Sequence, residues 1–114
     1  MSAEMKEILT RSQVPEELRW RLEDLYGSDE ECEKDIEKAK ELSKKLAAFR
    51  GRVGESARNL RECIETALEL GDVVEACYTY SKMRQDEDTA VSRYQDLQGR
   101  TAALAVQVKS ASAF

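Results

Sequence analysis

Apolar residues recur along most of this chain at alternating steps of three and four, the spacing of a helix that buries one face. Three such runs follow one another. The first begins at Ser28, which together with Glu31 forms the S-x-x-E signature of a capping box at a helix start. Gly51 and Gly54 mark the end of this helix. Its apolar positions are Cys32, Ile36, Ala39, Leu42, Leu46, Phe49 and Val53.

The second run opens near Ser56, an N-cap candidate, and continues through Gly71 to about Gln85. Glycine inside a helix costs only ~1 kcal/mol relative to alanine, so burial on both sides can override it. We therefore favour one continuous or gently kinked helix. Because Asp72 and Glu75 form a second capping signal, two helices that meet near Gly71 are the alternative. The apolar stripe is Leu60, Ile64, Ala67, Leu70, Val74, Cys77, Tyr80 and Arg84.

The third run follows the acidic stretch Asp86–Thr89, which suits a helix start. Three long helices with short connections favour antiparallel neighbours, so we predict an all-α, up-down-up bundle over residues 28–114. The apolar pattern reaches Phe114 without a Gly, Asn or Pro to stop it, and we interpret the chain as a piece of a larger protein. The stripe of this helix is Val91, Tyr94, Leu97, Thr101, Leu104, Val108 and Ala111.

Residues 1–27 precede the bundle, and we predict that they form a strap with a short helix across it. Pro15, the only proline, suits the first turn of a helix, and Gly27 ends the segment. Trp20 lies beside a leucine stripe, where an aromatic side chain serves more often as a staple than as a platform for a ligand. That stripe consists of Leu18, Leu22 and Leu25.

The composition agrees with a helical protein and narrows its partners. The chain has 114 residues, 36% of them charged, with one Pro and five Gly, a profile of long helices and not of a sandwich or barrel. Because 23 acidic residues outnumber 18 basic ones, nucleic acid and anionic membranes are poor partners. No stretch approaches the ~20 apolar residues of a membrane span, and the first residues lack an apolar signal core. We expect a cytoplasmic protein.

The sequence contains no histidine, which removes whole classes of chemistry. Triads of the Ser/His/Asp or Cys/His kind are impossible, and so is a His-Glu-x-x-His zinc site. The three cysteines are too widely spaced for a metal knuckle or a redox pair, and each lies on or beside an apolar stripe. We predict that Cys32, Cys63 and Cys77 are reduced thiols packed in the core.

The remaining candidates for a site have simpler structural explanations. A calcium loop that started at Asp86 would need Gly and Glu at its sixth and twelfth positions, where Val91 and Leu97 stand. Tyr78 and Tyr80 could present hydroxyls to a peptide, but a place in the core and at its rim is favoured. The carboxylates are spread over the outer faces. We therefore assign no catalytic, cofactor-binding or metal-binding residue to this chain.

Several short segments, in order and at matching spacing, resemble the N-terminal helical region of the oligoendopeptidase F family of zinc metallopeptidases. The resemblance runs from Val14 to Thr89 and continues more loosely to Phe114. One departure is Cys32, which stands where the family usually has a tryptophan. The segments are Pro15-Glu-Glu17, Trp20-Arg-Leu-Glu-Asp-Leu-Tyr26, Ser28-Asp-Glu-Glu31, Phe49-Arg-Gly51, and Tyr78-Thr-Tyr80 followed by Arg84 and Asp86-Glu-Asp-Thr89.

The resemblance implies a complete enzyme that is a cytosolic peptidase and cleaves short peptides inside an enclosed channel. Its zinc would lie on a His-Glu-x-x-His helix in a catalytic domain outside this chain. The present piece would wall the channel, touch peptide substrates only indirectly, and lack activity alone. It would dock on the catalytic domain through an exposed apolar strip, or self-associate to cover that strip. The alternative is a free-standing helical protein-interaction module.

Overall fold

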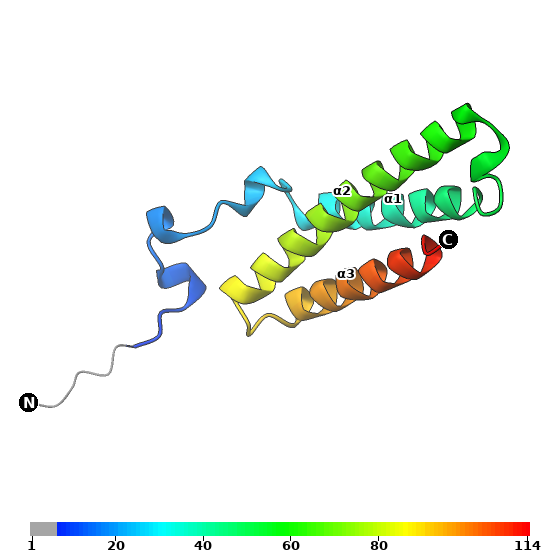
Figure 1. The fold of residues 1–114 in the computed structure, drawn as a ribbon. Helices are drawn as coiled ribbons and strands as arrows, with labels where there is room; N and C mark the ends of the chain where they lie inside the picture. Colours follow the sequence, from blue (N-terminus) through cyan, green and yellow to red (C-terminus); the bar gives the residue numbers. More distant parts are fainter. Residues whose placement is uncertain (1–6) are drawn as a thin grey trace, which may run out of the picture.

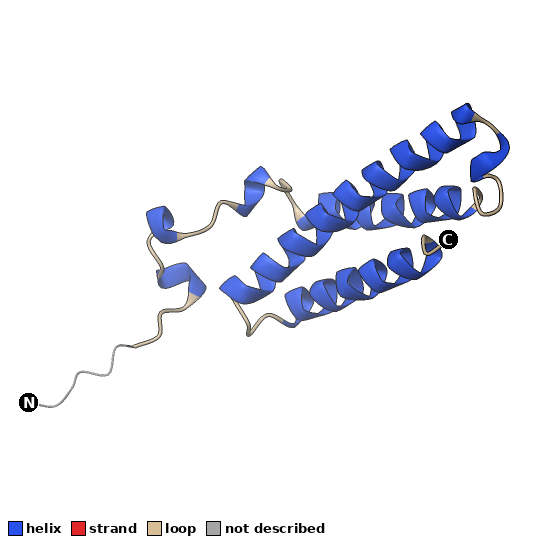
Figure 2. Ribbon diagram, viewed as in Figure 1, coloured by secondary structure: helices blue, strands red, loops and turns tan. Residues whose placement is uncertain are grey.

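The computed structural model describes residues 7–114, and all regular structure within them is helical (Figure 2). Three long helices make up the bundle: α1 (Asp29–Ala47), α2 (Ala57–Glu87) and α3 (Ser92–Ala111). They run up, down and up, and α2 packs against both of the others (Figure 1). This arrangement confirms the predicted all-α bundle. Among the described residues, no helix combines the length and apolar character needed to cross a membrane.

The first two helices begin at the predicted serines. The Ser28 hydroxyl accepts a hydrogen bond from the Glu31 amide at 3.3 Å, and the Ser56 hydroxyl accepts one from the Asn59 amide at 3.0 Å. The Glu31 carboxylate accepts from the Gly27 amide at 2.8 Å, one residue before the expected capping-box donor. Each cap satisfies an amide that has no partner within its helix.

α2 is a single helix of 31 residues, so the prediction of continuity through Gly71 is confirmed. The predicted face is only partly correct. Leu70, Cys77 and Tyr80 are buried, whereas Leu60 and Ile64 are 47% and 51% exposed. In the first half of α2 the buried side chains are those of Cys63, Thr66 and Leu70. The helix carries apolar residues on two faces there, and the bundle covers the face with the smaller side chains.

The third helix begins later than its acidic signal predicted. Asp86 and Glu87 belong to the last turn of α2, and α3 starts at Ser92 without a side-chain cap. The Asp88 carboxylate accepts a hydrogen bond from the Ala90 amide at 3.2 Å and so stabilises the turn between the helices. The acidic stretch therefore ends one helix and forms a turn, and the prediction that it starts α3 is wrong.

The core is a column of side chains between the three helices, with two residues of the N-terminal segment at one end. Cys32, Cys63 and Cys77 are all buried and unbridged, as predicted. A pair of buried hydroxyls, Ser81 and Thr101, joins α2 to α3 at 2.6 Å. The buried apolar residues are Leu22, Tyr26, Cys32, Ile36, Ala39, Leu46, Phe49, Cys63, Leu70, Val73, Cys77, Tyr80, Leu97 and Leu104.

The N-terminal segment forms three separate 3₁₀ turns, at Arg11–Gln13, Glu16–Leu18 and Leu22–Asp24, and residues 1–6 of the predicted strap lie outside the described residues. Extended backbone at Arg19, with ψ of 147°, separates the second turn from the third. The Arg19 side chain donates to the Val14 carbonyl at 2.7 Å, which helps to hold this irregular path. Leu18 stays exposed as a result, and Leu22 enters the core.

Candidate functional site

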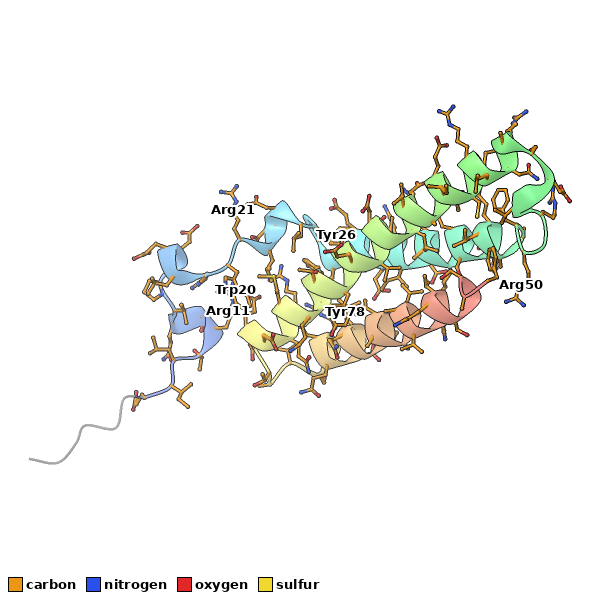
Figure 3. All side chains as sticks on the ribbon, in the orientation of Figure 1. Arg11, Trp20, Arg21, Tyr26, Arg50 and Tyr78 are labelled. Carbon is orange, nitrogen blue, oxygen red and sulfur yellow. The ribbon has the colours of Figure 1, made fainter. Side chains whose placement is uncertain are left out.

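Polar residues far apart in the sequence meet where the N-terminal segment reaches the start of α1 and the end of α2. We call Arg11, Asp29, Tyr80, Arg84 and Glu87 the junction cluster. Figure 3 shows Arg11 and Trp20 on the N-terminal segment, next to the end of α2. The sequence analysis assigned no site residue, and among these five it weighed only Tyr80, as a contact for a peptide, and Glu87, within the rejected calcium loop that starts at Asp86.

Tyr80 lies at the centre of the junction cluster. Its hydroxyl donates to Asp29 Oδ1 at 2.5 Å and accepts from Arg84 Nε at 3.2 Å. Its ring is fully buried and meets the Tyr26 ring edge-on, with the centroids 5.3 Å apart. Burial, and then the hydrogen bond to Asp29, raise the pKa of Tyr80 to about 12. The phenol is therefore protonated at neutral pH and acts as a fixed donor.

Arg84 and Arg11 enclose the carboxylate of Glu87. Arg84 Nη1 lies 2.8 Å from Glu87 Oε1, and Arg11 Nη2 lies 3.0 Å from Glu87 Oε2. The second contact is an ion pair without hydrogen-bond geometry, because Oε2 accepts no hydrogen bond. The guanidinium of Arg84 also lies over the Tyr80 ring, 5.3 Å from its centroid. This arrangement fastens the N-terminal segment to α2 by charge.

The electrostatics keep Arg84 charged. Burial by itself lowers the pKa of Arg84, but the hydrogen bonds to Tyr80 and Glu87 outweigh it and raise the pKa overall. On the other side, Asp29 is held by Arg93 Nη2 at 3.1 Å. The carboxylates of Asp29 and Glu87 thus each have an arginine partner. Neither carboxylate is left alone in an apolar pocket, as a general acid would require.

A second group of polar atoms lies deeper, between α1 and α2. The Tyr26 hydroxyl donates to Asp35 Oδ2 at 2.6 Å and lies 3.5 Å from Cys77 Sγ. Cys77 Sγ in turn donates to the Cys32 carbonyl at 3.9 Å. Burial and the bond to Asp35 raise the pKa of Tyr26, and a hydrogen bond with Cys77, followed by burial, raises the pKa of the Cys32 thiol. A protonated, fully buried thiol is a poor nucleophile.

The described residues offer little for catalysis. Across residues 7–114 no group of three His, Cys, Asp or Glu side chains could hold a metal ion. Trp20 is 50% exposed beside a surface hollow of about 550 Å³ that Arg11 and Arg19 also line. The stapling expected of Trp20 is done by Leu22 and Tyr26 instead. Tyr78 is 38% exposed while Tyr80 is buried, which matches the predicted division into rim and core.

Comparison with known proteins finds similar sequences among oligopeptidases and oligoendopeptidases. No family model matches the chain, and no solved structure matches it significantly. An oligopeptidase named PepF from Bacillus subtilis is 38% identical over 91% of this chain and 16% of its own length. A chromosomal oligoendopeptidase F from Lactococcus lactis is 33% identical over 94% of this chain and 18% of its own length. The group B oligopeptidase PepB of Streptococcus agalactiae is 31% identical over 82% of this chain and 16% of its own length.

These matches relate the helical fold of this chain to one part of larger peptidases. The chain is similar to oligoendopeptidase F proteins over most of its own length, and the resemblance inferred from its motifs is confirmed. It spans only about a sixth of the length of the curated relatives that it matches, with coverage of 16% to 18%. The activity, substrates and partners of a whole protein of this kind are therefore matters for proposal.

Proposed function

We propose that this chain is the N-terminal helical region of a cytoplasmic zinc metallopeptidase that hydrolyses short peptides. In this proposal the region walls the substrate channel and leaves bond cleavage to the catalytic domain of the same polypeptide. The observation that carries the proposal is the similarity itself, which covers 91% of this chain but only 16% of the Bacillus oligopeptidase. A region that is small relative to the whole protein suits an accessory role.

The residues of this chain do not fit a zinc site. The sequence has no histidine, and no set of three metal-binding side chains occurs within residues 7–114. Zinc prefers three or four His, Cys or carboxylate ligands that converge on one point. Zinc, and the water that it would activate, are therefore proposed for the catalytic domain. No step of the reaction is assigned to this chain.

A channel wall must be stiff, and the bundle has this property. α2 has 31 residues, which corresponds to a rod of about 46 Å at the usual rise per residue. α1 and α3 support it along much of its length, and the junction cluster holds its final turns. Such a wall selects substrates by size, because it cannot bend to admit a folded protein. This selection requires no reactive residue in the wall.

An exchange experiment in a whole enzyme tests the proposal. The matching region of the Bacillus subtilis oligopeptidase is replaced by this chain in one variant and deleted in a second. We expect the exchange variant to cleave short fluorogenic peptides and to leave long unfolded chains intact. The deletion variant should accept longer substrates. An unchanged length limit after deletion, in a protein that still cleaves short peptides, would contradict the role of a wall.

The chain alone provides a second test. We expect no hydrolysis of the same peptides by the purified 114-residue chain in the presence of added zinc. Zinc-dependent activity that co-purifies with the chain through several columns would overturn the proposal. The exposed side chains of Leu60, Ile64 and Leu68 favour one other function, that of a helical protein-interaction module. That function is preferred if the chain is well folded but the exchange variant is inactive.

A further inference from the structure

α2 carries a second apolar stripe on the side that the bundle leaves open. We call it the α2 seam. Its positions alternate in steps of three and four residues without interruption over three seven-residue (heptad) repeats. Most of these side chains are exposed, and Ile64 is 51% exposed. Leu68, beside the seam, is 65% exposed. The α2 seam consists of Ala57, Leu60, Ile64, Ala67, Gly71, Val74 and Tyr78.

A seam with this period fits one other helix laid lengthwise against it. A strict seven-residue repeat keeps an apolar stripe facing its partner along a gentle left-handed supercoil. Ala67 and Gly71 lie at the middle of the α2 seam, and their small size allows two helix backbones to approach closely. Bulkier side chains, Leu60 and Tyr78, lie towards its two ends. The partner that fits is therefore a helix with small residues at its own centre.

The charges beside the α2 seam indicate which partner helix fits it. Arg61 and Glu75 lie seven residues before and seven residues after Leu68, along the same edge of the helix, and both are exposed. An antiparallel second copy centred on Leu68 would bring Arg61 against the partner's Glu75, and Glu75 against the partner's Arg61. A parallel copy would instead put these charges on opposite sides of the seam, where neither pair of opposite charges can form.

The apolar layers fit best in an antiparallel copy centred one residue later, at Glu69. About that centre Leu60 lies level with the partner's Tyr78, and Ile64 with the partner's Val74, while the small residues meet in the middle and the long side chains of Arg61 and Glu75 span the offset of one residue. Arg61 already donates to Glu65 through Nε at 2.9 Å. The guanidinium has five donors in all, so its terminal nitrogens remain able to bind a second carboxylate.

We propose that two copies of this chain associate through their α2 seams into an antiparallel, two-fold symmetric dimer. A surface that is complementary to itself in this way is the ordinary form of a two-fold interface. The inference rests on α2 alone and does not depend on the proposed role in a peptidase. The competing occupant is another part of a longer polypeptide, which would cover the same stripe.

Sedimentation equilibrium of the full 114-residue chain tests the association. We expect a dimer that Ile64→Glu converts to a folded monomer, because the substitution puts a charge into the seam. Circular dichroism verifies that the variant is still helical. A wild-type chain that is monomeric at every concentration tested, and is unaffected by Ile64→Glu, would overturn the proposal and leave the stripe to the competing occupant.

A charge exchange tests the orientation. Arg61→Glu alone and Glu75→Arg alone should each weaken the dimer about tenfold, since each creates two repulsive contacts per dimer. The double variant restores both pairs with their signs reversed, so we expect it to regain most of the lost affinity. Arg58→Glu, on the outer side of α2, is the matched control and should change little. Single variants that weaken the dimer without recovery in the double variant would contradict the antiparallel arrangement.

Cross-linking tests the register. Under mild oxidation with oxidised glutathione, Leu68→Cys should give a covalent dimer, because this position faces its own copy across the two-fold axis. Leu60→Cys lies far from its own copy and should not cross-link, and neither should the wild-type chain, whose cysteines are all buried. Equal cross-linking at positions 60 and 68, or cross-linking at 60 only, would overturn the proposed register.

Discussion

The hydroxyl of Tyr80 donates a hydrogen bond that links α2 to α1 inside the junction cluster, and removing it gives a sharp test of that cluster. Tyr80→Phe keeps the buried ring and its edge-on contact with Tyr26. It deletes one bond donated to Asp29 at 2.5 Å and one accepted from Arg84 at 3.2 Å. We expect the variant to fold into the same bundle with a lower free energy of unfolding.

The size of this loss in the free energy of unfolding depends on the partners that Asp29 and Arg84 keep. A hydrogen bond to a charged group contributes about 1.5–3 kcal/mol, and unmatched buried partners add to the cost of losing it. Asp29 keeps Arg93 and its side chain is 20% exposed, and Arg84 keeps Glu87, so neither charge is left alone. The expected loss is therefore near the lower end, about 2 kcal/mol, which corresponds to a fall in Tm of roughly 8 °C for a domain of this size.

Urea unfolding followed by circular dichroism measures this loss at a fixed protein concentration. The midpoint should fall while the slope m stays constant, because the folded surface is unchanged. Tyr78→Phe is the matched control, since Tyr78 lies on the same helix with its side chain partly exposed, and we expect a change within about 0.5 kcal/mol. A Tyr80→Phe variant as stable as the control would refute the argument that the cluster fastens α1 to α2.

Three further predictions concern other parts of the chain. Gly51 has a φ of 75°, a conformation that strains other residues, so Gly51→Ala should lower the free energy of unfolding by about 1 kcal/mol, measured by thermal melts. At Gly71 an added Cβ would meet nothing within 4 Å, so Gly71→Ala should raise the same quantity by about 0.5–1 kcal/mol. The hydrogen bond from Arg100 lowers the pKa of Glu33 below its ordinary value, so this pair stabilises the fold above that value and loses its effect as the pH falls through the lowered pKa. Urea midpoints at pH 7 and pH 3 should therefore differ less in Glu33→Gln than in the wild type; an equal difference would contradict the assignment.

The helices were predictable because their signals are local. Ser28 and Ser56 cap as expected, and the regular stripe through Gly71 outweighs the low helix propensity of one glycine. The family could be inferred from short motifs, since the order and spacing of rare residues such as Pro15 and Trp20 carry information that composition does not.

The face of α2 could not be chosen from the sequence, because that helix is apolar on two sides. Leu60 and Ile64 fit the expected spacing better than Cys63 and Thr66, yet the bundle buries the smaller residues and leaves the larger ones open. Small side chains let α1 and α2 pack closely. Which face a helix buries is decided by its neighbours, and a single stripe does not contain this information.

The junction cluster was missed for a related reason. Tyr80 and Asp29 are 51 residues apart, and nothing in the local pattern of either residue indicates the other. The available signal was Arg84, which follows Tyr80 by one helical turn on a stripe that is otherwise apolar. A charged residue at such a position requires a partner, and that requirement could have directed the search to Asp29.

The irregular N-terminal segment and the regular bundle differ in how their backbone amides are protected. Each 3₁₀ turn closes on very few hydrogen bonds, such as Leu18 to Pro15 and Arg19 to Glu16, and most of these residues are exposed. The amides in the middle of α2 lie inside an unbroken ladder between two packed helices. Hydrogen exchange should therefore be fast in residues 11–24 and slow around Leu70, where exchange requires the whole bundle to unfold. We therefore expect the segment to open separately, as a second cooperative unit joined to the bundle near Tyr26.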